Sequence, residues 1–173
     1  MKVVAYPRLS AQQQRAVGLP TNRHQVVVGG PGSGKSLVLL HRATRLVENG
    51  IPADRIQIVT YTNALEQYLR SGATQIGLPK DCVTTYDSLI SNYFTRLVGG
   101  KFPKTAEGDR DYDETRRMVG ERVTARPRRD FDAVLVDEGQ DLGPADFATL
   151  RGLSEHVTVV MDSRQRLYDR GST

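Results

Sequence analysis

The sequence predicts an α/β fold in which helices flank a mostly parallel β-sheet. Short apolar runs rich in β-branched residues alternate with segments of helical spacing along most of the 173 residues, as in strand–helix–strand units. One such run, residues 25–28, leads directly into a glycine-rich loop and then into a helix-like segment. Another, residues 133–136, ends in the adjacent carboxylates Asp137 and Glu138. Because ligands of such sheets bind beyond the carboxyl ends of the strands, we expect both features at one edge.

Composition narrows the class of protein. Apolar residues make up 38% and charged residues 25% of the chain, as in an ordinary globular domain, and the length suits one domain. No apolar run approaches the roughly 20 residues that a membrane-spanning helix needs, and the apolar part of the N-terminus is too short for a signal peptide. The single cysteine, Cys82, excludes an internal disulfide and favours a reducing, cytoplasmic location. A net charge of +4 permits a phosphate-rich partner without requiring one.

A helix is expected first, over residues 10–17. Ser10 is a suitable N-cap, and apolar residues recur with helical spacing as far as Val17. This helix could simply pack on the sheet; alternatively, a glutamine amide on it could hold an adenine edge through one donor and one acceptor. The first strand is expected at residues 24–28. The helix after the glycine-rich loop is expected at residues 34–48, where an Asn-Gly pair ends it.

The glycine-rich loop at residues 29–36 fits the pattern G-x-x-x-x-G-K-[ST] of a phosphate-binding loop. Glycines let successive backbone N–H groups face one concavity, and the following helix N-terminus adds partial positive charge. Lys35 would place its ammonium against the β- and γ-phosphates of a nucleotide, and Ser36 would offer a hydroxyl to Mg²⁺. The residues expected to cradle the phosphates are Gly30, Gly32, Ser33, Gly34 and Lys35.

The alternation of strands and helices continues beyond this loop. The segments expected next are a strand at 55–61, a helix at 64–71, a loop at 72–80, a short strand at 81–85 and a helix at 86–98.

Residues 101–130 differ in composition from the rest of the chain. They carry charges of both signs and few apolar residues, although Met118, Val119 and Val123 allow a short helix. We expect an insertion that packs on the rim of the domain or is partly mobile. Its basic residues could contact nucleic acid, but the charge count alone favours a solvated surface.

The carboxylates after residues 133–136 form the second chemical motif. Asp137 would lie beside the phosphates and, with Ser36, hold Mg²⁺, usually through water. Glu138 would be free to orient and deprotonate an attacking water. The simpler alternative is an acidic turn at a strand end. A helix at 143–153 and a parallel strand at 156–162 follow, and Gln165, just past that strand, could sense a γ-phosphate.

Taken in order, these motifs resemble the N-terminal ATPase domain of superfamily 1 helicases of the UvrD/Rep type, a RecA-like P-loop NTPase domain. Residues 9–17 resemble the Q motif, residues 29–36 match motif I, and Asp137-Glu138-Gly139-Gln140-Asp141 matches the D-E-x-Q-D of motif II. Residues 60–63, 85–89 and 162–168 resemble motifs Ia, Ic and III.

The resemblance implies roles for particular residues and names the nucleotide as ATP. It places Gln13 against adenine, makes Glu138 the base, and gives Gln140 and Gln165 the task of coupling the γ-phosphate to the nucleic-acid face. It assigns catalytic roles to Lys35 and Gln165 as well. Tyrosines on that face would be stacking platforms, although each could instead be a half-buried tyrosine, Tyr86 above all. The residues implied to contact nucleic acid are Tyr61, Asn63, Tyr86, Tyr168 and Arg170.

The chain also departs from the family pattern. Leu37, Asp87 and Met161 stand where the family usually has Arg, His and Gly, and residues 99–130 replace a much longer inserted 1B subdomain. The resemblance covers one RecA-like domain within residues 1–173, whereas the family uses a second one, whose arginines complete the ATP site.

The sequence therefore predicts the Mg-ATP-binding half of a superfamily 1 DNA helicase or translocase that contacts single-stranded nucleic acid, with DNA favoured over RNA. It would be incomplete for unwinding on its own and would need a second RecA-like domain from the full protein or a partner chain. The alternative is a stand-alone ATP-binding switch or adaptor with little or no hydrolysis.

Overall fold

A computed structural model of the chain describes residues 3–163. The described part contains a five-stranded sheet in the order β1-β5-β4-β2-β3, and every neighbouring pair of strands is parallel. This arrangement confirms the predicted α/β class. The strands are β1 (Gln25–Gly29), β2 (Ile56–Thr60), β3 (Val83–Thr85), β4 (Phe131–Val136) and β5 (Ser154–Asp162).

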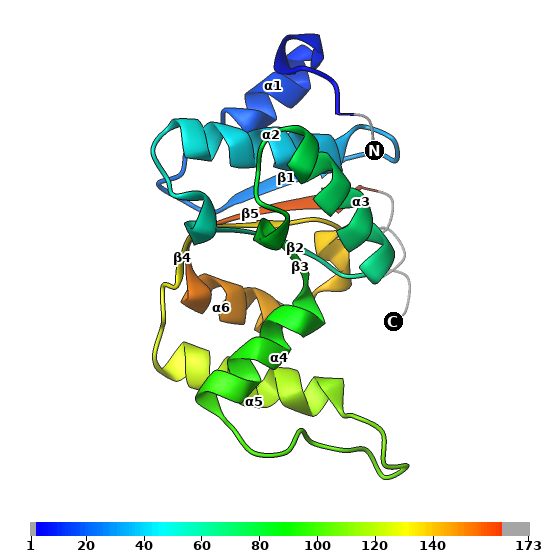
Figure 1. Cartoon of the computed structure of the whole chain (residues 1–173), viewed down its shortest axis with the longest axis vertical. Helices are drawn as coiled ribbons and strands as arrows, with labels where there is room; N and C mark the ends of the chain where they lie inside the picture. The colour runs from blue at the N-terminus through cyan, green and yellow to red at the C-terminus, as the bar shows by residue number, and fades with distance from the viewer. Residues whose placement is uncertain (1–2, 164–173) are drawn as a thin grey trace, which may run out of the picture.

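Helices cover both faces of this sheet. Helices α1, α2 and α3 lie on one side, and α4, α5 and α6 lie on the other (Figure 1). Their bounds are α1 (Ala11–Val17), α2 (Lys35–Glu48), α3 (Asn63–Gln75), α4 (Tyr86–Leu97), α5 (Tyr112–Ala125) and α6 (Pro144–Leu153). Short 3₁₀ turns are formed by Tyr6–Arg8, Ala53–Arg55, Lys80–Cys82 and Gly139–Asp141.

The sheet is covered on both faces, so its central strands are apolar almost throughout. All of β2 is buried, and so are the last four residues of β4. One apolar core lies between the sheet and helices α2 and α3; it includes Leu39, Leu40, Ile58 and Leu135. A second core lies under α4, α5 and α6; it includes Tyr93, Phe94, Val119, Val134 and Leu150.

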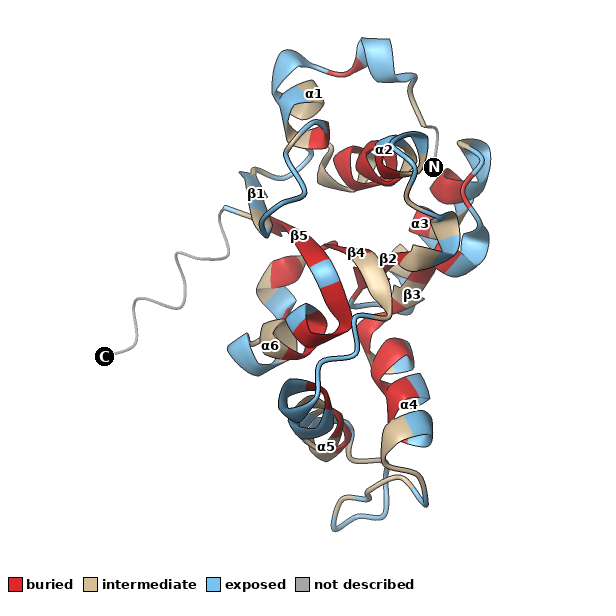
Figure 2. Ribbon diagram, turned by 90° about the vertical axis from the view of Figure 1, so that its left-hand side faces the viewer, coloured by how far each residue is buried: buried red, intermediate tan, exposed pale blue. Residues whose placement is uncertain are grey.

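The charged segment 101–130 is more ordered than the sequence analysis expected. It forms a 14-residue helix, α5, in which Thr115, Val119 and Val123 are buried. Both valines belong to the core shared with α4 and α6. Figure 2 shows α5 packed beneath α6, with buried and exposed residues along it. The segment therefore contributes to the hydrophobic core and is not only an addition at the rim.

Some element boundaries also differ from the prediction, among them those of α3 and β3. Helix α3 runs on to Gln75 because Gly72, which was expected to end it, is a buried helical residue. The chain turns after the helix, where Gly77 adopts a positive φ of 78°. Strand β3 is shorter than expected, because residues 80–82 form a 3₁₀ turn before it.

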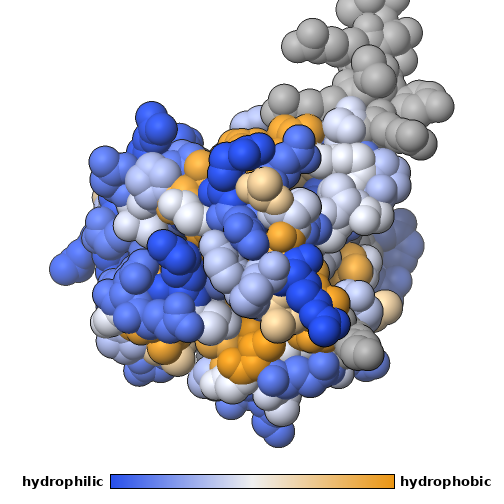
Figure 3. Space-filling model, turned by 90° about the horizontal axis from the view of Figure 1, so that it is seen from above, coloured by the Kyte–Doolittle hydropathy of each residue, from blue (hydrophilic) through white to orange (hydrophobic). Residues whose placement is uncertain are grey.

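The surface at the end of the molecule that carries α1 is mainly polar. Viewed from that end, hydrophilic side chains predominate and apolar groups form separate patches (Figure 3). Within residues 3–163, no helix has the length and apolar character needed to cross a membrane.

Candidate functional site

The sheet brings the predicted functional segments to one edge. Strands β1, β5 and β4 are neighbours, and Gly29 at the end of β1 is paired in register with Asp162 at the end of β5. Asp137 follows the last residue of β4 and continues the ladder, because its N–H donates to the carbonyl of Val59 at 2.8 Å. The glycine-rich loop and the acidic motif therefore meet at the carboxyl ends of the strands, as expected.

The glycine-rich loop has the shape of an anion cradle. Gly34 is the N-cap of α2 and has a φ of 79°, which favours glycine, and a Cβ there would lie 2.6 Å from Nε2 of Gln13. Around Gly30 and Gly32 the space is open, since a Cβ at either position would meet no atom within 4 Å. No side chain caps the first turn of α2, so its backbone N–H groups are available to an anion. The loop thus fits a phosphate group.

Lys35 lies folded against this loop. Its Nζ donates to the carbonyl oxygens of Gly29 at 3.2 Å and Gly30 at 3.0 Å, and it lies 3.5 Å from Oδ2 of Asp162. Only 9% of the side chain is exposed. The ammonium is therefore held where the phosphates would lie. Asp162 is not among the site residues predicted from the sequence, although a carboxylate at the end of an apolar strand is a signal for such a role.

Ser36 and Asp137 form a direct contact. The Ser36 hydroxyl donates to Oδ2 of Asp137 at 2.6 Å, and the carboxylate is buried. Burial raises the pKa of Asp137, and the hydrogen bond from Ser36 opposes this shift. A hydroxyl and a carboxylate are oxygen ligands of the kind that Mg²⁺ prefers, so the pair fits the predicted metal site. At the same edge, the buried Thr60 hydroxyl has no hydrogen-bond partner among the described residues, which suits a site for a polar ligand.

Glu138 is held by the residues around it. It has a φ of 52°, a left-handed conformation that is uncommon for a residue with a side chain. Its Oε2 accepts from Nε2 of Gln140 at 2.5 Å, and Oε1 of Gln140 accepts from the N–H of Asp162 at 3.1 Å. A Cβ at Gly139 would overlap Cγ1 of Val159, so the turn after β4 lies directly against β5. Gln140 therefore connects the predicted base to the end of β5.

Gln13 connects α1 to the glycine-rich loop. With Ser10 it forms a capping box: the Ser10 N–H donates to Oε1 of Gln13, and the Gln13 N–H donates to the Ser10 hydroxyl. Nε2 of Gln13 donates to the Ser33 carbonyl at 2.9 Å. Gln13, Lys35 and Val28 also line a cleft of about 390 Å³ between α1, β1 and the loop. The adenine contact of Gln13 stays a prediction. Ser10 was predicted to be the cap; the reciprocal bond from its N–H to Gln13 was not predicted, although the S-x-x-Q spacing signals it.

The residues predicted to contact nucleic acid do not all lie on the surface. Tyr61, with 37% of its area exposed, and Asn63 line a second cleft of about 380 Å³ beside β2 and β3. The prediction that Tyr86 contacts nucleic acid is wrong, because only 1% of this residue is exposed and it belongs to the core under α4. Burial raises the pKa of the Tyr86 hydroxyl. Its ring is not available for stacking on a base. Gln165, Tyr168 and Arg170 lie outside the described residues.

The fold and the site together define a class of protein. The sheet is parallel, a phosphate-binding type of glycine-rich loop follows one strand, and a carboxylate stands at the end of a nearby strand. This is the arrangement of an α/β RecA-like P-loop domain. Within that class the chain is similar to a particular family, since a family model described as UvrD/REP helicase N-terminal domain matches residues 9–94. The match includes α1, the glycine-rich loop and Tyr61, and it confirms the resemblance seen in the sequence. No curated protein was found to match the chain.

Proposed function

We propose that this domain binds Mg-ATP at the glycine-rich loop and is the ATPase half of a superfamily 1 helicase or translocase. The observation that carries the proposal is the contact of 2.6 Å between the Ser36 hydroxyl and Asp137, with the Lys35 ammonium folded into the loop beside them. These three residues come from two segments about a hundred positions apart in sequence, and the sheet brings them together.

Each residue of the site has a role in this proposal. The loop amides and Lys35 bind the β- and γ-phosphates, and Lys35 exchanges its contact with Asp162 for the phosphate oxygens. Ser36 and Asp137 hold Mg²⁺, which neutralises charge on those oxygens when it is bound. Glu138 orients a water and takes its proton, and Gln140 keeps the Glu138 carboxylate in place.

The nucleic-acid contact lies farther along the same edge of the sheet. Strands β2 and β3 end beside the cleft that Tyr61 and Asn63 line, whereas the loop and Asp137 lie at the ends of β1 and β4. We propose that single-stranded DNA crosses this part of the edge and that a second RecA-like domain, from the same protein or from a partner chain, completes turnover. Gln165 remains the predicted link to the γ-phosphate.

The first experiment measures binding of a fluorescent ATP analogue with Mg²⁺, and ATP turnover with and without single-stranded DNA. Lys35→Ala should abolish binding, whereas Glu138→Gln should retain binding and lose any turnover. Lys80→Ala is the matched control. It removes the same charge from an exposed residue just before β3, and β3 is the outer strand on the side of the sheet away from β1.

The outcomes test the nucleotide site and the need for a second domain. Binding that depends on Lys35, with turnover at background, supports a motor half or an ATP-binding switch. Turnover that DNA stimulates and that both site variants abolish means that the domain is a self-sufficient ATPase, so the need for a second domain is wrong. Binding that Lys35→Ala and Lys80→Ala leave equally strong overturns the nucleotide site itself.

A further inference from the structure

The cleft beside Tyr61 is built from three segments that are distant in sequence. Tyr61 lies in the turn after β2 and Asn63 is the first residue of α3, whereas Asp87 comes from the first turn of α4. The third side is formed by Arg110, two residues before α5, and Tyr112, the first residue of α5; both belong to the charged segment 101–130. A segment that the sequence analysis could not distinguish from solvated surface therefore forms one wall of the cleft.

Arg110 supplies a positive charge that is not neutralised within residues 3–163. Its Nη2 donates to the Ser91 hydroxyl at 2.6 Å, and no carboxylate in this part of the chain forms an ion pair with it. Its Nε is buried without a hydrogen-bond partner. The guanidinium carbon lies over two aromatic rings, 3.6 Å from the centroid of Phe102 and 4.8 Å from that of Tyr112. The group is thus held in place by packing, while its charge remains available to an anion.

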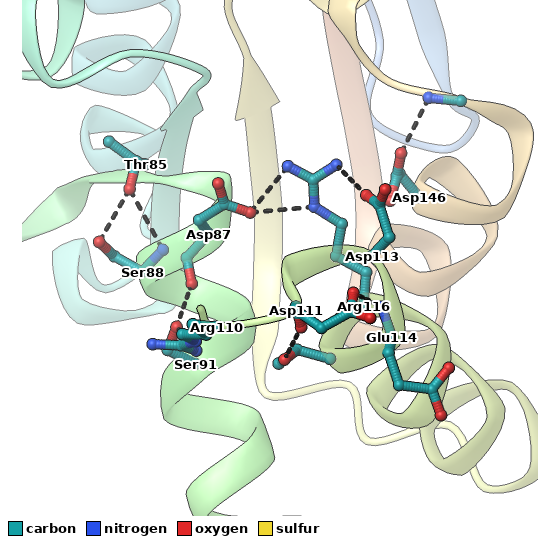
Figure 4. A network of polar contacts seen from close by, with 12 residues as sticks. Thr85, Asp87, Ser88, Ser91, Arg110, Asp111, Asp113, Glu114, Arg116 and Asp146 are labelled. Atoms are coloured by element: carbon teal, nitrogen blue, oxygen red, sulfur yellow. Dashed lines mark hydrogen bonds and ion pairs between the residues drawn. The ribbon is translucent and has the colours of Figure 1, made fainter. Parts of the chain in front are cut away.

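The other charges at the cleft are already paired. Asp87 lines the cleft, but its Oδ1 accepts from Nε of Arg116 at 2.9 Å and from Nη2 at 2.8 Å. Arg116 also contacts Asp113 (Figure 4). The same figure shows Arg110 beside Ser91, which lies on α4 together with Asp87. Asp87 is thus ion-paired with Arg116, whereas Arg110 is the charged residue lining the cleft that has no ion-pair partner within residues 3–163.

Aromatic surface lies next to this charge. Tyr112 has 46% of its area exposed and Tyr61 has 37%, and both rings line the cleft. Arg116 lies 5.6 Å from the Tyr61 centroid, which places a cation over that ring as Arg110 does for Tyr112. Exposed rings beside a guanidinium that has no ion-pair partner are a combination suited to single strands, because unpaired bases stack on the rings while a cation pairs with the phosphate.

The backbone adds to the positive potential. Helices α3 and α4 both begin at the cleft, and their N-caps, Thr62 and Thr85, line it. The positive ends of the two helix dipoles therefore face the same space. A duplex offers no free base faces to the tyrosines, whereas a single strand offers bases and phosphates together.

We infer that Arg110 and Tyr112 form a subsite for one nucleotide unit of single-stranded nucleic acid, with Arg110 on the phosphate and Tyr112, beside Tyr61, on the base. This inference rests on the proposed function and adds to it the segment 101–130. It assigns that segment a direct role in holding the strand.

Fluorescence anisotropy with a labelled oligothymidine tests this subsite across a range of salt concentrations. Arg110→Gln should weaken binding about tenfold and lower the slope of log affinity against log salt by about 0.7, because one phosphate contact on a single strand is lost. Tyr112→Ala should weaken binding about five- to 100-fold and leave the slope unchanged, and Tyr112→Phe should restore most of the affinity because the ring remains.

Arg122→Gln is the matched control for charge. It removes the same charge from an exposed position of α5 that lines a different pocket. Thermal unfolding of each variant shows whether it is folded; if Arg110→Gln is not, the exposed Tyr112 variants decide alone. Equal binding by the unchanged protein, Arg110→Gln and Tyr112→Ala overturns the subsite but leaves the proposed function standing. No binding of the oligonucleotide by the unchanged protein, with Mg-ATP present, overturns the subsite together with the proposed single-stranded DNA contact, whereas the ATP site is decided by the Lys35→Ala experiment.

Discussion

Gly139 follows the predicted base in the turn after β4, where the chain lies directly against β5. Glu138 already has a positive φ, and a Cβ at Gly139 would overlap Cγ1 of Val159 and lie 3.3 Å from the Val160 carbonyl. The short contact from Gln140 to Glu138 depends on the path of this turn. The position therefore constrains both the packing of β5 and the placement of the Glu138 carboxylate.

Gly139→Ala should lower the free energy of unfolding by about 1–3 kcal/mol, because the added methyl group forces a backbone or Val159 shift in a packed core. Urea denaturation measures this change. Gly18→Ala is the control, since Gly18 has an ordinary φ of −84° and a Cβ there would meet its first neighbour at 3.5 Å. Equal stability of the two variants would show that the turn can move away from β5.

The side-chain amide of Gln13 makes two hydrogen bonds, to the Ser10 N–H and to the Ser33 carbonyl, and substitutions can remove one or both. Gln13→Glu keeps an acceptor for the Ser10 N–H, so the capping box survives, but it loses the donor to the Ser33 carbonyl. We expect α1 to stay intact while the affinity for Mg-ATP falls severalfold, as measured with a fluorescent analogue. Gln13→Ala should lose both bonds and about 1 kcal/mol of stability in addition.

Gln12→Glu controls for the added negative charge, because Gln12 is exposed and lines the same cleft. If Gln12→Glu and Gln13→Glu weaken ATP binding equally, the effect is one of charge and the Ser33 contact is not responsible.

At the scale of elements, α5 shows how a charged segment can be part of a core. Its buried residues, Thr115, Val119 and Val123, recur every four positions and form one narrow stripe. Ion pairs among the other residues occupy its outer face, such as that between Arg117 and Glu114 at 2.6 Å. The valines pack in the same core as Phe94 of α4.

Val123→Ala should therefore destabilise the domain by about 1–3 kcal/mol, because it removes two buried methyl groups and leaves a cavity. Chemical denaturation measures the change. Val26→Ala is the matched control, since Val26 on the edge strand β1 is among the exposed apolar residues and should cost much less. A rim insertion without a core role would instead make Val123→Ala as mild as Val26→Ala.

These elements also show what could be predicted from the sequence. The glycine-rich loop and the run ending at Asp137 were predictable because each pattern is contiguous and its chemistry follows from residue type. Helix α5 was underestimated because its apolar stripe is narrow and its charges dominate the composition. Tyr86 was predicted on the nucleic-acid face because its position at the start of a helix does not show whether its side chain points into the core. The cleft with Arg110 was missed because it exists only when three distant segments meet.

At the scale of the whole molecule, one buried arginine joins parts of the fold that are far apart in sequence. Arg42 of α2 donates to the Thr158 hydroxyl on β5 and to the carbonyls of Val17, the last residue of α1, and Leu19. Its Nη2 also contacts Nε2 of His156 at 2.9 Å. Because arginine only donates, this histidine nitrogen must be the acceptor and the imidazole must be neutral. Burial lowers the pKa of Arg42 to about 10, so it is still charged at neutral pH.

This arrangement makes the stability of the domain sensitive to acid. Burial, and then the nearby Arg42 charge, lower the pKa of His156 from 6.5 to about 4. The unfolded chain binds a proton near pH 6.5 while the folded protein does not, so folding stability is fully retained above pH 6.5 and is lost as the pH falls toward 4. At 1.36 kcal/mol per pKa unit, the loss is at most about 3 kcal/mol.

His156→Gln keeps an oxygen acceptor for Arg42 and removes the titration. Urea denaturation at pH 7.5 and pH 4.5 should therefore show a smaller loss for this variant than for the unchanged protein. Burial also lowers the pKa of His24, whereas it raises that of Asp137, so both proteins keep some pH dependence from other groups and the difference between them isolates His156. Parallel losses in the two proteins would mean that His156 is already protonated, or solvated, in the folded state.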